Sequence, residues 1–123
     1  MTKQAVYLVP FSHLDLFWGG SREECLSRGS RVIRAALDLL DKYESYRFMV
    51  ESTNFLAHHL DCFPEDLPRI RKCAREGRLE LIPMRSIIYS QLPSGETAVR
   101  NLLYGRAYCL STAGTYSPEG SCE

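Results

Sequence analysis

The chain has 123 residues, which is enough for one domain with a hydrophobic core but short for a complete barrel enzyme. Basic and acidic residues balance at 15 each, so the charge excludes a strongly basic nucleic-acid surface or a polybasic membrane surface. A neutral, polar small molecule remains open as a partner.

The chain contains five cysteines: Cys25, Cys62, Cys73, Cys109 and Cys122. Their number is odd and none forms a C-x-x-C pair, so we expect no disulfide framework or zinc knuckle but reduced thiols in a cytoplasmic protein. The apolar run from Ala5 to Phe11 is too short to span a bilayer, and it leads into His13 and Asp15 rather than into a small-residue cleavage site. We therefore interpret this run as a strand and not as a signal peptide.

The first predicted strand, Ala5 to Pro10, is followed by the clearest predicted helix. Ser21 and Glu24 form an S-x-x-E capping box, which marks a helix start. Apolar residues then recur at helical spacing at Leu26, Ile33, Leu37 and Leu40. The pattern predicts a helix that runs to about Tyr43.

The second predicted strand, Tyr46 to Val50, leads into a helical stretch that begins near Asn54. Pro64 and Pro68 interrupt this stretch, because a proline inside a helix removes a hydrogen bond and clashes with the preceding turn. Helical spacing resumes at Leu67, Ile70 and Ala74, and Gly77 supplies a left-handed stop. We therefore predict two short helices rather than one long helix.

The third predicted strand, Leu79 to Pro83, precedes the last predicted helix. Ser94 can cap the start of this helix, Glu96 favours its positive end, and Gly114 ends it. The remaining residues, 114–123, lack periodicity and are rich in turn residues, which predicts a disordered tail.

Three apolar strands that alternate with helices predict an α/β fold with a parallel sheet and right-handed crossovers. This order fits either an open sheet or the first three β/α units of a parallel barrel-like domain. In the second case the edge of the third strand would stay unpaired, where the next barrel strand should add.

His13 and Asp15 are the main candidate site residues. Side chains two apart on a strand point the same way, and ligands gather at the carboxyl ends of parallel strands. An imidazole nitrogen and a carboxylate oxygen together supply half of a tetrahedral zinc site. The alternative is a polar pair that caps the strand and binds the next loop.

Trp18 lies three residues after Asp15 and is followed by Gly19 and Gly20, which places its ring in a loop over the same sheet end. Such a ring can stack on the apolar face of a sugar. The alternative is ordinary packing against the first helix, since tryptophan is usually largely buried.

Other polar residues favour structural roles. His58 and His59 are adjacent in a predicted helix and point about a hundred degrees apart, so we expect one partly packed and one exposed rather than a joint metal site. Glu51 ends the second strand and could face Asp15, but a cap of the next turn is the simpler interpretation. Glu96 and a residue four positions later, Arg100, are spaced for an ion pair.

Three segments carry a specific resemblance: "HLDLFW", "REGRLELIP" and "LPSGETAVRNLLYG". In this order they resemble the H-x-D-x-x-W opening, the short G-R-x-E-x stretch and the later P-S-G-E-x-x-x-R-x-x-x-x-G segment of glycoside hydrolase family 38, the retaining α-mannosidases. The resemblance extends to about Gly105, and it identifies residues 1–113 as an N-terminal part of the family's catalytic domain.

The resemblance implies an irregular β/α barrel in which zinc is held by His13 and Asp15 and Trp18 walls the sugar pocket. In the family the metal binds sugar hydroxyls, which orients the ring and helps to distort it toward an oxocarbenium-like transition state. The implied substrates are mannose-containing oligosaccharides or glycans.

The chain lacks part of that site. The family's nucleophile is an aspartate on a later strand and its second zinc histidine also comes late, whereas Asp66 and His59 are the last of their kind here. We therefore expect the nucleophile beyond this chain, and we predict that the chain alone does not hydrolyse α-mannosides. The alternative is a non-catalytic sugar-binding or interaction module derived from such an enzyme. An unrelated metal hydrolase would need more ligands than the three histidines offer.

Overall fold

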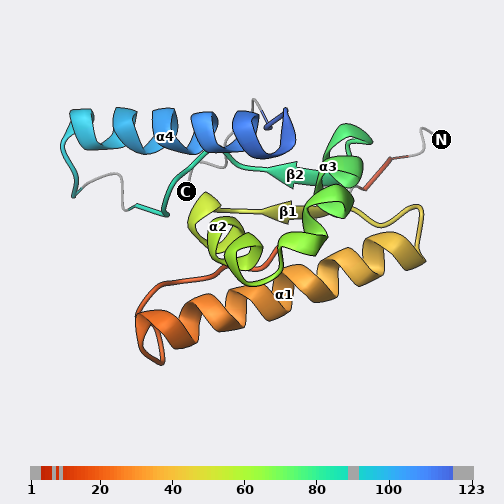
Figure 1. Ribbon diagram of the computed structural model, residues 1–123. Coiled ribbons are helices and arrows are strands. Elements are labelled where there is room, and N and C mark those ends of the chain that lie inside the picture. The colour runs from red at the N-terminus through yellow and green to blue at the C-terminus, as the bar shows by residue number, and fades with distance from the viewer. Residues whose placement is uncertain (1–3, 7, 9, 89–91, 118–123) are drawn as a thin grey trace.

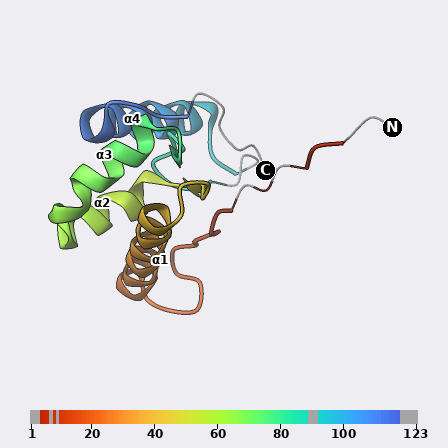
Figure 2. The same ribbon diagram turned by 90° about the vertical axis from the view of Figure 1, so that its right-hand side faces the viewer.

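The computed structural model describes residues 4–6, 8, 10–88 and 92–117. Its elements, in chain order, are α1 (Arg22–Lys42), β1 (Phe48–Val50), α2 (Thr53–Cys62), the 3-10 helix η1 (Pro64–Asp66), α3 (Leu67–Arg75), β2 (Leu79–Leu81) and α4 (Gly95–Ala113). Helices α1 and α4 lie on opposite sides of the strands, and α2 and α3 lie across them (Figure 1). A view along the strands shows the helices wrapped around them, with the N-terminal segment on the remaining side (Figure 2).

The sheet in the described part of the chain consists of β1 and β2, which run parallel with Phe48 opposite Leu79 and Val50 opposite Leu81. These apolar side chains are buried against the helices, whereas Glu80 on the other face is exposed. The predicted parallel sheet and α/β class are confirmed. The barrel-like arrangement stays a prediction, since the sheet in the described part of the chain has two strands.

The first predicted strand is not formed as expected. Among the described residues of this segment, the side chains of Val6 and Leu8 are 84% and 86% exposed. Pairing with β1 is confined to a bridge between Phe11 and Met49, where the Met49 amide donates to the Pro10 carbonyl at 3.2 Å. Pro10 has no N–H to donate in return, and the described apolar side chains that precede it, those of Val6 and Leu8, lie in solvent.

The helix boundaries follow the predicted signals closely. At the start of α1 the Ser21 amide donates to the Glu24 carboxylate at 2.7 Å, and the Glu24 amide donates back to the Ser21 hydroxyl at 3.3 Å. The two short helices after β1 are also confirmed. Gly77 and Gly114 both have the left-handed backbone, with φ of 66° and 75°. None of the helices in the described residues is long and apolar enough to cross a membrane.

The residues that follow α4 differ from the predicted disordered tail. The Ser117 amide donates to the Leu81 carbonyl at 2.9 Å, on the edge of β2 that faces away from β1. Tyr116 packs against the core, and the Arg106 guanidinium lies 5.4 Å from its ring. The chain thus returns to the sheet edge that was expected to stay unpaired, while residues 118–123 lie outside the described ranges.

A single buried cluster joins the helices to the strands. Its members are Leu26, Ile33, Ala36, Leu37, Leu40, Phe48, Val50, Phe55, Leu56, Ile70, Cys73, Ala74, Leu79, Leu81, Cys109 and Ala113. Because every helix from α1 to α4 contributes to this cluster, the core fixes the position of the strand ends, where the candidate site lies.

Candidate functional site

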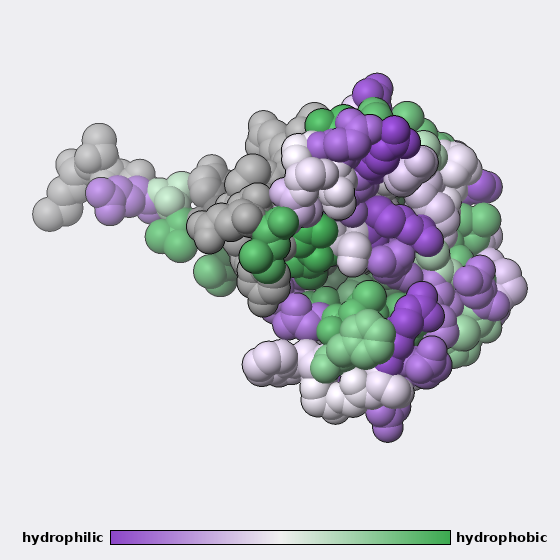
Figure 3. All heavy atoms as spheres, turned by 90° about the vertical axis from the view of Figure 1, so that its left-hand side faces the viewer, coloured by the Kyte–Doolittle hydropathy of each residue, from purple (hydrophilic) through white to green (hydrophobic). Residues whose placement is uncertain are grey.

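The carboxyl ends of the strands carry the candidate site. His13 and Asp15 follow the bridge at Phe11, Glu51 follows β1, and a loop of residues 82–88 follows β2. The strand arrows in Figure 1 point toward this end of the molecule, and Figure 3 faces it and shows hydrophobic and hydrophilic side chains side by side. This is the end at which α/β folds place their ligands.

His13 lies between two carboxylates. Its Nε2 atom is 3.4 Å from Oδ2 of Asp15, and its Nδ1 atom is 3.1 Å from Oε1 of Glu51. The side chains of His13 and Asp15 are 42% and 39% exposed, so this pair is open to solvent. The expectation that His13 and Asp15 share one side of the strand end is confirmed.

Glu51 differs from the interpretation as a cap for the next turn. The N-cap of α2 is Ser52, and no side chain caps the first turn of that helix. The Glu51 carboxylate instead turns to His13, and it is only 7% exposed. Its second oxygen, Oε2, is buried without a hydrogen-bond partner among the described residues. The available sequence signal was a carboxylate at the end of the strand that neighbours His13.

Trp18 lies beside the same end but is not packed against α1. The indole is 75% exposed and the neighbouring Phe17 ring is 69% exposed. The backbone is nevertheless tied down, because the Arg28 guanidinium donates to the Trp18 and Gly19 carbonyls at 3.3 Å. The alternative of ordinary packing on the first helix therefore does not describe the indole, which projects into solvent.

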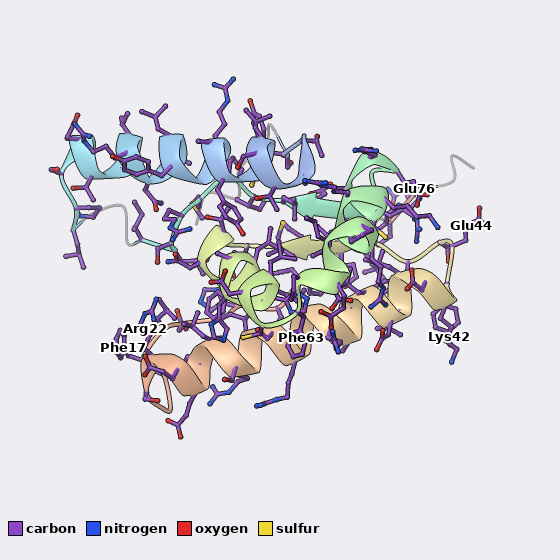
Figure 4. The ribbon with its side chains drawn as sticks, in the orientation of Figure 1. Phe17, Arg22, Lys42, Glu44, Phe63 and Glu76 are labelled. Carbon is purple, nitrogen blue, oxygen red and sulfur yellow. The ribbon has the colours of Figure 1, made fainter. Side chains whose placement is uncertain are left out.

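Phe17 adopts a left-handed backbone conformation, with φ of 64°. This conformation costs a residue with a side chain about 1–2 kcal/mol. Figure 4 shows Phe17 near the start of α1, at the outer end of the loop that follows Asp15. The loop between Asp15 and α1 thus stores strain and presents aromatic rings to solvent.

The loop after β2 is held from two helices. The Asn101 side chain of α4 accepts from the Ser86 amide at 2.9 Å and donates to the Ser86 carbonyl at 2.8 Å. From α2, the Thr53 amide donates to the Met84 carbonyl at 2.8 Å. Asn101 was not among the predicted site residues, although it lies within the segment "LPSGETAVRNLLYG" that carries the resemblance.

The same segment packs tightly against this loop. A Cβ atom on Gly105 would lie 2.3 Å from the Pro83 carbonyl oxygen, so only glycine allows α4 to approach so closely. The predicted ion pair between Glu96 and Arg100 is confirmed, with Nε donating at 2.7 Å on the exposed side of the helix. Both residues are explained by the structure of α4 itself.

The other histidines belong to the structural interior. His59 is completely buried, and its Nε2 atom lies 3.2 Å from Oδ2 of Asp66. His58 is half-buried, 3.7 Å from the Cys62 sulfur. The two rings do not form a joint site. In the described part of the chain, no group of three or more His, Cys, Asp or Glu side chains is placed to hold a metal.

Asp66 is the centre of what we call the Asp66 cluster, formed by Asp66, His59, Arg34 and Arg69. Arg34 donates to Oδ2 at 2.8 Å and Arg69 donates to Oδ1 at 2.9 Å. Burial raises the pKa of Asp66, but the hydrogen bonds from the two guanidiniums outweigh it and hold the pKa below its usual value of 3.8. Burial lowers the pKa of His59 from 6.5, against the attraction of Asp66.

The described cysteines Cys25, Cys62, Cys73 and Cys109 are free. Burial raises the pKa of the Cys109 thiol to about 11, which keeps it protonated and unreactive near neutral pH. Cys62 is exposed, and Cys122 lies outside the described residues.

Comparison with known proteins assigns the chain to a family. Residues 3–120 match the family described as "Glycosyl hydrolases family 38 N-terminal domain". The chain is 26% identical over 106 residues to "Alpha-mannosidase G" of Dictyostelium discoideum, which covers 84% of this chain but 10% of that protein.

Two solved structures from Enterococcus faecalis share the fold. An alpha-mannosidase from strain V583 matches 89% of this chain and 12% of its own, with a TM-score of 0.80 and 27% identity. A glycosyl hydrolase family 38 protein matches 98% of this chain and 14% of its own, with a TM-score of 0.83 and 29% identity. The chain therefore spans about a tenth to a seventh of the length of these relatives. It belongs to glycosyl hydrolase family 38, of which it forms an N-terminal domain.

Proposed function

We propose that this chain is the N-terminal part of a zinc-dependent retaining α-mannosidase that hydrolyses α-mannosidic bonds in oligosaccharides or glycans. The observation that carries the proposal is the approach of His13 Nε2 to Asp15 Oδ2, 3.4 Å apart at the carboxyl end of the sheet in a family 38 fold. The nucleophile would come from residues outside this chain.

The donor pair fits zinc in chemistry and in spacing. Two ligands bound at the usual Zn–N and Zn–O distances on a tetrahedral ion lie roughly 3.4 Å apart. His13 and Asp15 already have this separation, and both are open to solvent. When bound, zinc would supply a Lewis-acid centre that holds sugar hydroxyls. His13 and Asp15 would hold it, and the exposed Trp18 ring would stack on the sugar.

Zinc binding by the chain tests the metal part of the proposal. We expect binding of one zinc ion, weakly because the chain supplies half of a tetrahedral set, and loss of binding in Asp15→Ala. Glu80→Gln, a carboxylate change on the exposed face of β2, is the matched control. Equal zinc binding by wild type and Asp15→Ala would contradict the assignment.

Activity and sugar binding test the rest. We expect no turnover of an aryl α-mannoside by this chain, since hydrolysis with retention needs a second carboxylate placed as nucleophile. Turnover that Asp15→Ala abolishes would show that the chain is complete. Trp18 is the only tryptophan, so its fluorescence reports directly on saccharide binding in a titration with a mannose oligosaccharide.

A second candidate is a non-catalytic sugar-binding module, which the continuous buried core favours. This candidate predicts cooperative unfolding and saccharide binding without zinc. A broken barrel would instead give a molten or aggregated chain. Chemical unfolding followed by circular dichroism in the near and far ultraviolet separates the two.

A further inference from the structure

We propose that Glu51 is a positioning residue that fixes the orientation and tautomer of His13. This inference rests on the proposed function, because a positioned imidazole matters most as a metal ligand. Glu51 itself touches neither metal nor sugar in this proposal, and it acts through the ring of His13.

The burial of the Glu51 carboxylate costs free energy. Its side chain is 7% exposed at the end of β1, and Oε2 has no hydrogen-bond partner among the described residues. A buried carboxylate oxygen without a partner costs free energy, because it has lost its hydration and gained no hydrogen bond in return. Apolar Ile82 follows β2 as Glu51 follows β1 and is also buried, so the core accepts an apolar side chain at this level.

The hydrogen bond between His13 and Glu51 has a defined direction. An ionised carboxylate only accepts, so the 3.1 Å contact between Oε1 of Glu51 and Nδ1 of His13 places the ring proton on Nδ1. In the neutral imidazole, Nε2 then carries a lone pair. This lone pair lies 3.4 Å from a carboxylate oxygen of Asp15, and a cation between the two atoms, either a metal ion or a proton on Nε2, relieves their repulsion.

The hydrogen bond from His13 to Glu51 would strengthen a metal site at His13. Metal-binding histidines generally donate their second ring N–H to a carboxylate or carbonyl, which fixes the tautomer and makes the ligand more basic. Loss of such a partner lowers metal affinity by about 10–100-fold. Glu51 directly follows β1 and is buried, so it can hold His13 although His13 itself lies on an irregular segment.

The tautomer of His13 is the direct test. Long-range proton–nitrogen NMR of the ¹⁵N-labelled chain, without metal at pH 7.5, should show Nδ1 protonated and Nε2 unprotonated. Glu51→Leu should shift the ring toward the Nε2–H form, and Glu80→Gln should leave it unchanged. A wild-type ring that is in the Nε2–H form, or protonated on both nitrogens, would overturn the inference, even if the leucine variant does not fold.

Zinc affinity, measured by competition with a chromophoric chelator, separates this inference from the proposed function. We expect Glu51→Leu and Glu51→Gln to bind zinc about 10–100-fold more weakly than wild type, with the Gln variant less affected because it keeps an acceptor oxygen. Unchanged affinity in both variants would overturn the positioning role while the zinc assignment stands. A wild-type chain that binds no zinc, but shows the Nδ1–H tautomer, would overturn the zinc assignment while Glu51 still sets the ring.

Discussion

Two groups of charged residues surround a histidine in this chain, and they are built in opposite ways. In the Asp66 cluster, two guanidiniums converge on one carboxylate beside a fully buried imidazole. At the strand ends, two carboxylates converge on the imidazole of His13, which is 42% exposed. In the first group both oxygens of the carboxylate are paired with guanidiniums, whereas the second group is electron-rich and open.

The difference separates a structural role from a functional one. The Asp66 cluster joins α1, α2 and α3, and both oxygens of Asp66 accept hydrogen bonds in it, although the two ring nitrogens of His59 have no hydrogen-bond partner among the described residues. In the group of His13, Asp15 and Glu51, two carboxylates share one imidazole and one buried oxygen has no hydrogen-bond partner among the described residues, an arrangement that we propose attracts a cation. The histidine alone would not have distinguished the two sites, but the charges around it do.

Asp66→Ala tests the structural side of this comparison and should have the largest effect. Removal of the carboxylate leaves two arginines without their buried partner. We expect a loss of about 3 kcal/mol in the free energy of unfolding, at the low end for a broken buried pair because Arg34 is 39% exposed and can be hydrated. Urea unfolding measures it, with Glu65→Gln on the exposed side as the control. A loss below about 0.5 kcal/mol, the scale of ordinary surface changes, would contradict the assignment.

Gly105→Ala tests whether the loop after β2 is as rigid as its contacts indicate. The new methyl group would overlap the Pro83 carbonyl, so we expect a loss of about 1–3 kcal/mol in unfolding free energy. Gly95→Ala is the matched control, because no atom lies within 4 Å of a Cβ there. Equal stability of the two variants would show that α4 can move away from the loop.

Acidification should weaken the Asp66 cluster in stages. The pKa of His59 is below 6.5 in the folded chain, so the unfolded chain binds its proton first and stability falls as the pH drops below 6.5. The stabilisation from Asp66 is present above pH 3.8 and is lost as the pH falls through its lower folded pKa. Urea unfolding from pH 8 to 5 should show the first stage in wild type and His58→Gln but not in His59→Gln. The same slope in all three would exclude His59 as the cause.

Glu51→Leu should have the smallest effect on stability. This result would distinguish the group around His13 from the Asp66 cluster most clearly. Leucine removes a buried oxygen that has no partner among the described residues, so we expect a change of less than about 1 kcal/mol or a slight gain in unfolding free energy. Thermal and urea unfolding of the metal-free chain measure it beside Asp66→Ala. A loss as large as that of Asp66→Ala would place Glu51 among the residues that hold the fold.

The sequence predicts the helices well because their signals are local. The local signals are the capping box at Ser21, the prolines at the start of η1 and in the first turn of α3, and the glycines that end α3 and α4, and each acts within one helical turn. The first strand was wrong because a strand needs a partner on the sheet, and apolar composition at Val6 and Leu8 does not supply one.

The candidate site also combines a local feature, which the sequence predicts, with long-range contacts, which it does not. His13 and Asp15 are two residues apart in the sequence, so their closeness is a local feature, although residues 12–15 form no strand. Glu51 lies 38 residues from His13 along the chain, and its contact depends on the register of β1 beside the N-terminal segment. Neither that register nor the match of Asn101 to Ser86 can be deduced from composition or spacing.

Asn101 has a further consequence for the loop after β2. By pairing with both the N–H and the C=O of Ser86, its side chain imitates the peptide group of an adjacent strand. A single amide therefore satisfies both backbone groups of a loop residue five positions after the end of β2. Such mimicry tolerates few substitutes: aspartate lacks the donor, and glutamine carries its amide one methylene too far. Asn101 thus gives α4 a side chain that binds the loop as a backbone peptide group would.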